Sequence, residues 1–197
     1  MKINFPGDVK YLMMRTVLLA AFFSLLLWPA GAPGADIVGP DARLANGEIV
    51  LSTGLSLDDR NLADLKNGIS KEITFSIDLF RVWKSWPDEF IARKTIVQTL
   101  RSDPIKNEHV ATSLDGSTLT ERRFRSFDSM ISWALNIRDL KLANVRDLQQ
   151  SDYFVRVTVE SHLRKLPTVI GYLLFFVPEN DFREQKDSPV LSAGSVK

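Results

Sequence analysis

Cysteine is absent from all 197 residues of the chain, and histidine occurs only twice. The lack of thiols excludes disulfides, thiolate metal sites, cysteine nucleophiles and a cysteine-linked lipoprotein anchor. The sequence also has no Gly-x-Ser-x-Gly segment, no glycine-rich phosphate loop and no EF-hand loop. It therefore predicts no catalytic residues, no cofactor-binding residues and no metal ligands, and hence a protein that is not an enzyme and carries no cofactor.

An excess of one charge is missing as well. The 25 basic residues are matched by 24 acidic ones, which leaves a formal net charge of +1. So balanced a chain has no broad field to hold nucleic acid phosphates, and we expect no nucleic acid partner. Hydrophobic residues make up 45% and charged residues 25% of the chain, as in ordinary globular domains.

Only one long hydrophobic run is present, and it lies near the N-terminus. Val17–Trp28 is a run of twelve residues without a charge, with Arg15 just before it and Pro29, Gly31, Pro33 and Gly34 after it. This order is typical of a secretory signal peptide, and the run is shorter than the ~20 apolar residues that span a bilayer. We predict that residues 1–34 direct export to the periplasm or cell envelope, with cleavage before Ala35. The alternative is an uncut N-terminal anchor in the inner membrane.

Beyond the leader, alternating apolar residues predict mostly strands. Asn46-Gly47 predicts a type I′ hairpin over residues 41–57, and Asp115-Gly116 predicts a second hairpin. The other predicted strands cover 70–83, 89–101 and 153–163. Helices are predicted at 59–68, where Asp58 or Asp59 can cap the first turn, at 127–138, and at 167–176, where a strand is the competing interpretation.

These elements predict an α+β fold, mostly antiparallel β-sheet in a sandwich or curled form, with two or three packed helices. Residues 35–181 are expected to form a single globular domain. Residues 182–197 are polar and lack periodicity, and we predict that they form a disordered tail.

Basic residues are the first candidates for binding. Arg122, Arg123 and Arg125 lie on one arm of the second hairpin, while neighbouring predicted strands supply Arg81, Lys84, Arg93, Lys94 and Arg101. If the strands pair, a basic face would form, whose guanidinium groups could bind carboxylates or phosphates. The alternative, which we favour, is a solvated sheet face balanced by acidic residues, namely Asp78, Asp88 and Glu121.

Trp83 and Trp86, which flank Lys84, are the second candidates. Flat rings can stack on sugars, but packing in the core or at the end of the domain is the commoner role of such residues, and we favour it. Glu160 and His162 are two residues apart on a strand and therefore share a face. A surface pair is favoured there over a metal site, because spacing supplies no further ligand.

Several short segments occur in a recognisable order. They are Leu51-Ser52-Thr53, Leu65–Ile69, the strand Ile73–Leu79, the arginine–tryptophan stretch that follows it, Phe124–Phe127, Trp133-Ala134-Leu135, Tyr153–Arg156 and Leu166-Pro167. Together they resemble a bacterial family called domain of unknown function 4390. The resemblance covers roughly residues 40–182. It implies an exported protein without assigned chemistry, often encoded beside sensor kinases. The tryptophan-rich last strand of the family has no counterpart in residues 178–197, which contain no tryptophan.

The favoured function is a non-catalytic binding or protein-interaction module of the cell envelope. Its expected partners are an envelope protein, the membrane surface or an anionic ligand. One alternative is a periplasmic accessory to a membrane sensor kinase, which the family resemblance suggests. A less favoured alternative is a hydrolase that uses His162 and Glu160 with a further residue.

Overall fold

The computed structural model describes residues 34–163 and 180–193, which belong to one compact unit that begins at Pro33. Its elements, in chain order, are β1 (Ala35–Ala45), β2 (Glu48–Leu57), α2 (Asp59–Lys66), β3 (Lys71–Arg81), β4 (Glu89–Asp103), β5 (Glu108–Asp115), β6 (Thr118–Phe124), α3 (Phe127–Ala134), β7 (Asn136–Asn144), the short 3₁₀ helix η1 (Val145–Asp147), β8 (Ser151–Leu163), β9 (Asn180–Asp187) and β10 (Leu191–Ala193).

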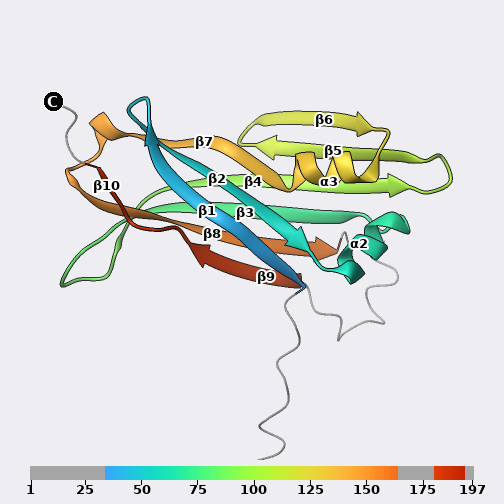
Figure 1. Cartoon of the computed structure of the whole chain (residues 1–197), viewed down its shortest axis with the longest axis horizontal. Coiled ribbons are helices and arrows are strands. Elements are labelled where there is room, and N and C mark those ends of the chain that lie inside the picture. The colour runs from blue at the N-terminus through green and yellow to red at the C-terminus, as the bar shows by residue number, and fades with distance from the viewer. Residues whose placement is uncertain (1–33, 164–179, 194–197) are drawn as a thin grey trace, which may run out of the picture. The chain divides into compact units, whose positions relative to one another are not determined.

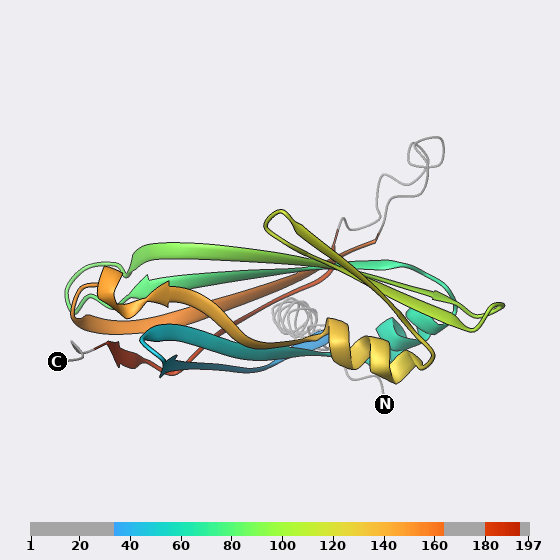
Figure 2. The same cartoon turned by 90° about the horizontal axis from the view of Figure 1, so that it is seen from above.

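The strands form two antiparallel sheets. The smaller sheet has the order β1-β2-β7, and the seven-stranded sheet has the order β10-β8-β3-β4-β5-β6, with β9 also paired to β8 (Figure 1). Figure 2 shows the two sheets as separate layers, with α2 and α3 at one end of the larger sheet. The prediction of an α+β fold dominated by antiparallel sheet is confirmed.

The core lies between the two layers and is centred on β3. Ile73, Phe75, Ile77 and Leu79 are at most 1% exposed, and they pack with buried residues of the smaller sheet such as Leu51. Successive side chains of a strand point to opposite faces, so the other residues of β3 lie on the second face of the large sheet. We call the face that carries Phe75 the inner face and the opposite one the outer face.

Local signals placed several elements correctly. Asn46 and Gly47 have φ values of 52° and 77°, as the predicted type I′ turn between β1 and β2 requires. Asp58 caps α2, because its Oδ1 accepts a hydrogen bond of 2.8 Å from the backbone N–H of Asn61.

The helix predicted over 127–138 ends earlier than expected. α3 stops at Ala134, and Asn136 begins strand β7. The Leu135 carbonyl accepts a 2.9 Å hydrogen bond from the backbone N–H of Leu55, and the side-chain amide of Asn136 donates to Ser132 O at 2.9 Å. Ile137 fits the helical spacing of the residues before it, but it lies in β7, because pairing with β2 determines the conformation there.

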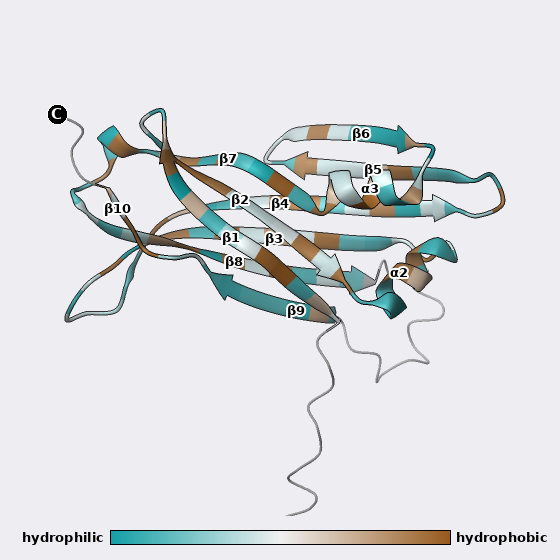
Figure 3. Cartoon of the chain, viewed as in Figure 1, coloured by the Kyte–Doolittle hydropathy of each residue, from teal (hydrophilic) through white to brown (hydrophobic). Residues whose placement is uncertain are grey.

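The prediction of a disordered tail is wrong for residues 182–193, which form most of β9 and all of β10. Ser188 ties this segment to β8, since its backbone N–H donates to Val155 O and its Oγ accepts from Val155 N–H. Figure 3 shows β9 as almost entirely hydrophilic. Its one hydrophobic residue is Phe182, which is buried. A strand with one buried apolar residue gives no periodic signal.

The helix predicted over 167–176 lies outside the described residues. Within the parts of the chain that the structure describes, no helix is long and apolar enough to cross a membrane.

Candidate functional site

The basic residues singled out from the sequence divide into two groups at opposite ends of the large sheet. Arg81 pairs in register with Glu89 of β4, at the end of β3 that is remote from α2. Arg123 pairs with Val110 of β5, and Val110 pairs with Arg101 of β4, near the start of β3. Ten residues of strand separate the two ends, or about 33 Å at ~3.3 Å per residue. The single basic face that strand pairing could have formed is therefore not present.

The two faces of the sheet separate these residues further. Arg122 lies on the inner face, where its guanidinium carbon is 5.3 Å from the centroid of the Trp133 ring in α3. Arg123 lies on the outer face, where Nη1 is 2.7 Å from Oε1 of Glu108. Arg122 and Arg123 are neighbours in β6, but their side chains lie on opposite faces of the sheet.

Arg81 holds the β3–β4 connection in place. The residue is 9% exposed, and its guanidinium binds the side chains of Gln149 and Glu89. The same guanidinium lies over the Trp83 ring, 4.6 Å from its centroid. Both terminal nitrogens of Arg81 are engaged and its Nε is buried, so Arg81 positions Trp83 and does not itself offer a binding group.

The β3–β4 connection exposes aromatic rings. Trp83 is 45%, Trp86 76% and Phe90 52% exposed, and among the described residues they are the only large aromatic side chains classed as exposed. We call these three residues the aromatic hairpin. Figure 1 shows the connection extending beyond the strand ends, at the end of the sheet remote from α2 and α3. Packing in the core or at the end of the domain, the role favoured from the sequence, is therefore wrong for Trp86 and only partial for Trp83.

Trp83 is fixed although it is exposed. Its indole Nε1 donates to Oε2 of Glu89 at 3.2 Å, and its backbone N–H donates to Oδ1 of Asp88 at 3.3 Å. Trp86 takes part in neither contact. Lys84, between the two rings, is exposed and forms no ion pair with any described residue.

A row of phenylalanines continues the aromatic surface across the outer face. Phe80 pairs in register with Phe90 and with Phe154. The Phe80 ring meets Phe90 edge to face at 5.9 Å and stacks on Phe154 at 5.3 Å. Such cross-strand aromatic pairs stabilise a sheet. Here the contact with Phe80 holds the exposed ring of Phe90 in place.

A ladder of alternating charges lies beside this row. Its Asp78–Arg93 pair is the kind of balance by acidic residues that was favoured from the sequence, whereas Arg156 and Asp187 were not predicted to take part. Arg93, Asp78, Arg156 and Asp187 pair directly across β4, β3, β8 and β9. Asp78 binds Arg93 through two hydrogen bonds of 2.5 and 2.7 Å, and Asp187 binds Arg156 through two of 2.8 Å. The hydrogen bonds and charge of Asp78 raise the pKa of Arg93, and the hydrogen bonds to Asp187 raise the pKa of Arg156. We call these four residues the charge ladder.

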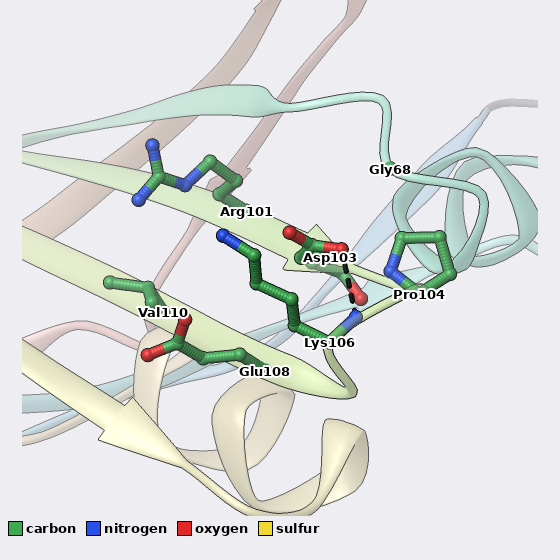
Figure 4. A pocket seen from close by; sticks show the side chains of 8 residues that line it. Gly68, Arg101, Asp103, Pro104, Lys106, Glu108 and Val110 are labelled. Atoms are coloured by element: carbon green, nitrogen blue, oxygen red, sulfur yellow. Dashed lines mark hydrogen bonds between the residues drawn. The ribbon is translucent and has the colours of Figure 1, made fainter.

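The opposite end of the sheet carries two open hollows, of which the first has two cations and two acids in its lining and the second has three cations and one acid. One of about 410 Å³ is lined by Arg101, Lys106 and Glu108 among others. The second, of about 560 Å³, shares Lys106 and Glu108 and adds Arg123 and Arg125. Figure 4 shows the side chains of Arg101, Lys106 and Glu108 around the first hollow, together with the hydrogen bond from Lys106 N–H to Asp103. We call Arg101, Lys106, Arg123 and Arg125 the cationic end.

The two histidines take different roles. His109 and Ser102 pair in register, with Ser102 Oγ 2.8 Å from His109 Nδ1. Their residues are 8% and 3% exposed, so this serine–histidine pair is buried away from any substrate in solution. His162 Nε2 lies 3.7 Å from Oε2 of Glu160, whose Oε1 lies 3.2 Å from Nε of Arg183, so Glu160 and His162 form a surface pair. No group of three metal-ligating side chains occurs within the described residues.

Comparison with known families completes this description. A family model described as Domain of unknown function (DUF4390) matches residues 32–188. The chain belongs to this family. No curated protein matches it significantly, and no solved structure does so. Membership in DUF4390 carries no catalytic or binding residues over to this chain, so its function has to be argued from the aromatic hairpin, the charge ladder and the cationic end.

Proposed function

We propose that this protein is an exported, non-catalytic binding module of the cell envelope, with the aromatic hairpin as its recognition surface. One observation carries the proposal: the exposed large aromatic side chains of the described residues all lie within residues 83–90. Exposed aromatic clusters are uncommon on soluble domains and mark binding sites.

The setting of the rings supports recognition. Arg81, Asp88 and Glu89 hold Trp83 in one orientation, so binding would cost little side-chain entropy. The nearby charges, Arg81 and Lys84 against Asp88 and Glu89, nearly cancel. An anionic ligand would therefore gain little from this surface, whereas uncharged sugar rings could stack on the indoles. In the envelope, the ligand class that fits is the glycan of the cell wall.

We expect Trp86→Ala to weaken binding to purified cell-wall sacculi about fivefold, as loss of one aromatic contact of ~1 kcal/mol would. Stability should change by less than ~0.5 kcal/mol, since the side chain is largely in solvent. Co-sedimentation with sacculi measures the first quantity and thermal unfolding the second. Ile105→Ala is the matched control, because Ile105 is 94% exposed and lies in the β4–β5 connection at the other end of the sheet. Equal binding by both variants and the unaltered protein would exclude the aromatic hairpin as the glycan site.

Export is tested separately from binding. We expect the protein to fractionate with the periplasm and its mature chain to begin at Ala35, because small residues precede that position and no proline follows it directly. Cell fractionation and the intact mass of the purified protein measure both points. An intact mass that retains residues 1–34, in a membrane fraction, would favour the anchor. Recovery from the cytosol would contradict export altogether.

A further inference from the structure

Strand β6 is the terminal strand of the large sheet. It pairs with β5 on one side, and no described strand pairs with its other side. Every residue from Thr118 to Arg123 is exposed, and Phe124 is half-buried. One edge of β6 therefore presents backbone N–H and C=O groups without a strand partner among the described residues, which is how sheets accept an added strand.

The hairpin turn defines which residues present these groups. Asp115 pairs with Thr118, which closes a two-residue loop that begins at Gly116 with φ +58°. In such a hairpin the closing pair is hydrogen-bonded, and bonded and non-bonded pairs then alternate along the strands. Thr118, Thr120 and Arg122 thus turn their backbone groups toward β5. Leu119, Glu121 and Arg123 turn theirs toward the open edge.

Cations surround the far end of this edge. Arg123 is matched by Glu108 at 2.7 Å and by Glu121 at 3.8 Å. Arg101, Lys106 and Arg125 form no ion pair within the described part of the chain. The carboxylate of Asp103, the other acid nearby, accepts hydrogen bonds from the backbone N–H groups of Ile105 and Lys106. Three cations around the two hollows thus have no ion-pair partner among the described residues, and the four cations of this end exceed its three acids, Asp103, Glu108 and Glu121, by one charge. Guanidinium groups in this state can bind carboxylates.

We propose that β6 is a docking edge for an extended acidic segment of a partner protein. The segment adds to the sheet as a strand beside β6, through the backbone groups of Leu119, Glu121 and Arg123. Its carboxylates occupy the hollows at the cationic end. A second copy of this chain fits less well, because it would bring a second set of arginines to the same edge. This surface is distinct from the aromatic hairpin, so it does not depend on the glycan proposal.

The test uses a fluorescent nonapeptide of alternating Glu and Val, with an alternating Lys and Val peptide as the probe of opposite charge. Adding the purified protein should raise the fluorescence anisotropy of the acidic peptide and leave that of the basic peptide unchanged. Glu121→Pro should weaken that binding at least about tenfold, because it removes one outward N–H without touching the pairs with β5. Glu121→Ala is the matched control and should bind as well or better, because it keeps the N–H and removes an acidic side chain.

A second measurement applies even if Glu121→Pro fails to fold. Hydrogen exchange of the unaltered protein should show that the acidic peptide protects the amides of Leu119, Glu121 and Arg123. Arg125→Glu should lower the affinity severalfold. Three results would overturn the proposal. They are no binding of the acidic peptide, binding that leaves these amides unprotected, and a dimer in sedimentation that Glu121→Pro dissociates.

Discussion

Replacing Lys71 with alanine is expected to lower the free energy of unfolding by about 3 kcal/mol, the lower end of the cost of breaking a buried ion pair by removing one partner, because the two acids left behind are partly exposed. Lys71 is completely buried. Its Nζ lies 2.5 Å from Oδ2 of Asp181 and 3.4 Å from Oδ2 of Asp64. One ammonium group thus joins β3, β9 and α2. Its loss leaves two carboxylates facing each other without a cation.

Urea denaturation of the purified protein measures this effect. Asp64→Ala serves as the control, because Asp64 is the more distant and more exposed partner, and its loss should cost less than about 1 kcal/mol. The double variant Lys71→Met with Asp181→Asn should recover part of the stability, since it removes charge from both sides of the pair. If Lys71→Ala costs no more than Asp64→Ala, the ammonium group does not stabilise this junction.

The charge ladder gives the second large expectation. Asp78→Asn should cost about 2 kcal/mol, since hydrogen bonds to charged groups contribute ~1.5–3 kcal/mol. The Asp78 side chain is 6% exposed, and its partner Arg93 is 57% exposed. Arg93 can therefore regain water after the substitution, which keeps the loss at the lower end of the range. Arg156 would lose the acid on its β3 side and keep only Asp187.

The matched control is Asp187→Asn at the end of the same ladder, where the side chain is 41% exposed. That substitution should cost less than ~1 kcal/mol, as exposed ion pairs do. Urea denaturation measures the free energy of unfolding of both variants. Urea is uncharged, so it does not screen the ion pairs, and the ionic strength stays the same in both measurements. If Asp78→Asn and Asp187→Asn lower the free energy of unfolding by similar amounts, burial does not strengthen the hydrogen bonds of Asp78.

Local sequence patterns were sufficient for the elements whose determinants are close in the chain. The Asn46-Gly47 turn depends on two residues that tolerate positive φ. The strand around Phe75 follows from alternation, because one buried face is enough to impose a period of two. The cap of α2 depends on one side chain, Asp58, three residues from its donor. Each signal is short-range, so no knowledge of the packing was needed.

Elements that depend on distant partners were missed or misplaced. Residues 136–144 form a strand because β2, more than eighty residues earlier, pairs with them. Residues 180–193 are ordered because β8 pairs with β9 and β10. Neither segment carries enough apolar periodicity to show this by itself.

Composition and local pattern alone showed a chain without cysteine or a recognisable catalytic motif and predicted its mostly antiparallel α+β fold, and they also predict a leader. They also marked Trp83, Trp86 and the arginines as unusual. Only the tertiary structure decided what these residues do. Exposure and the direction of a side chain depend on strand register, and register joins residues that are far apart in the sequence. Packing exposed the aromatic hairpin, separated Arg81 from Arg123, and brought Arg93, Asp78, Arg156 and Asp187 into one ladder.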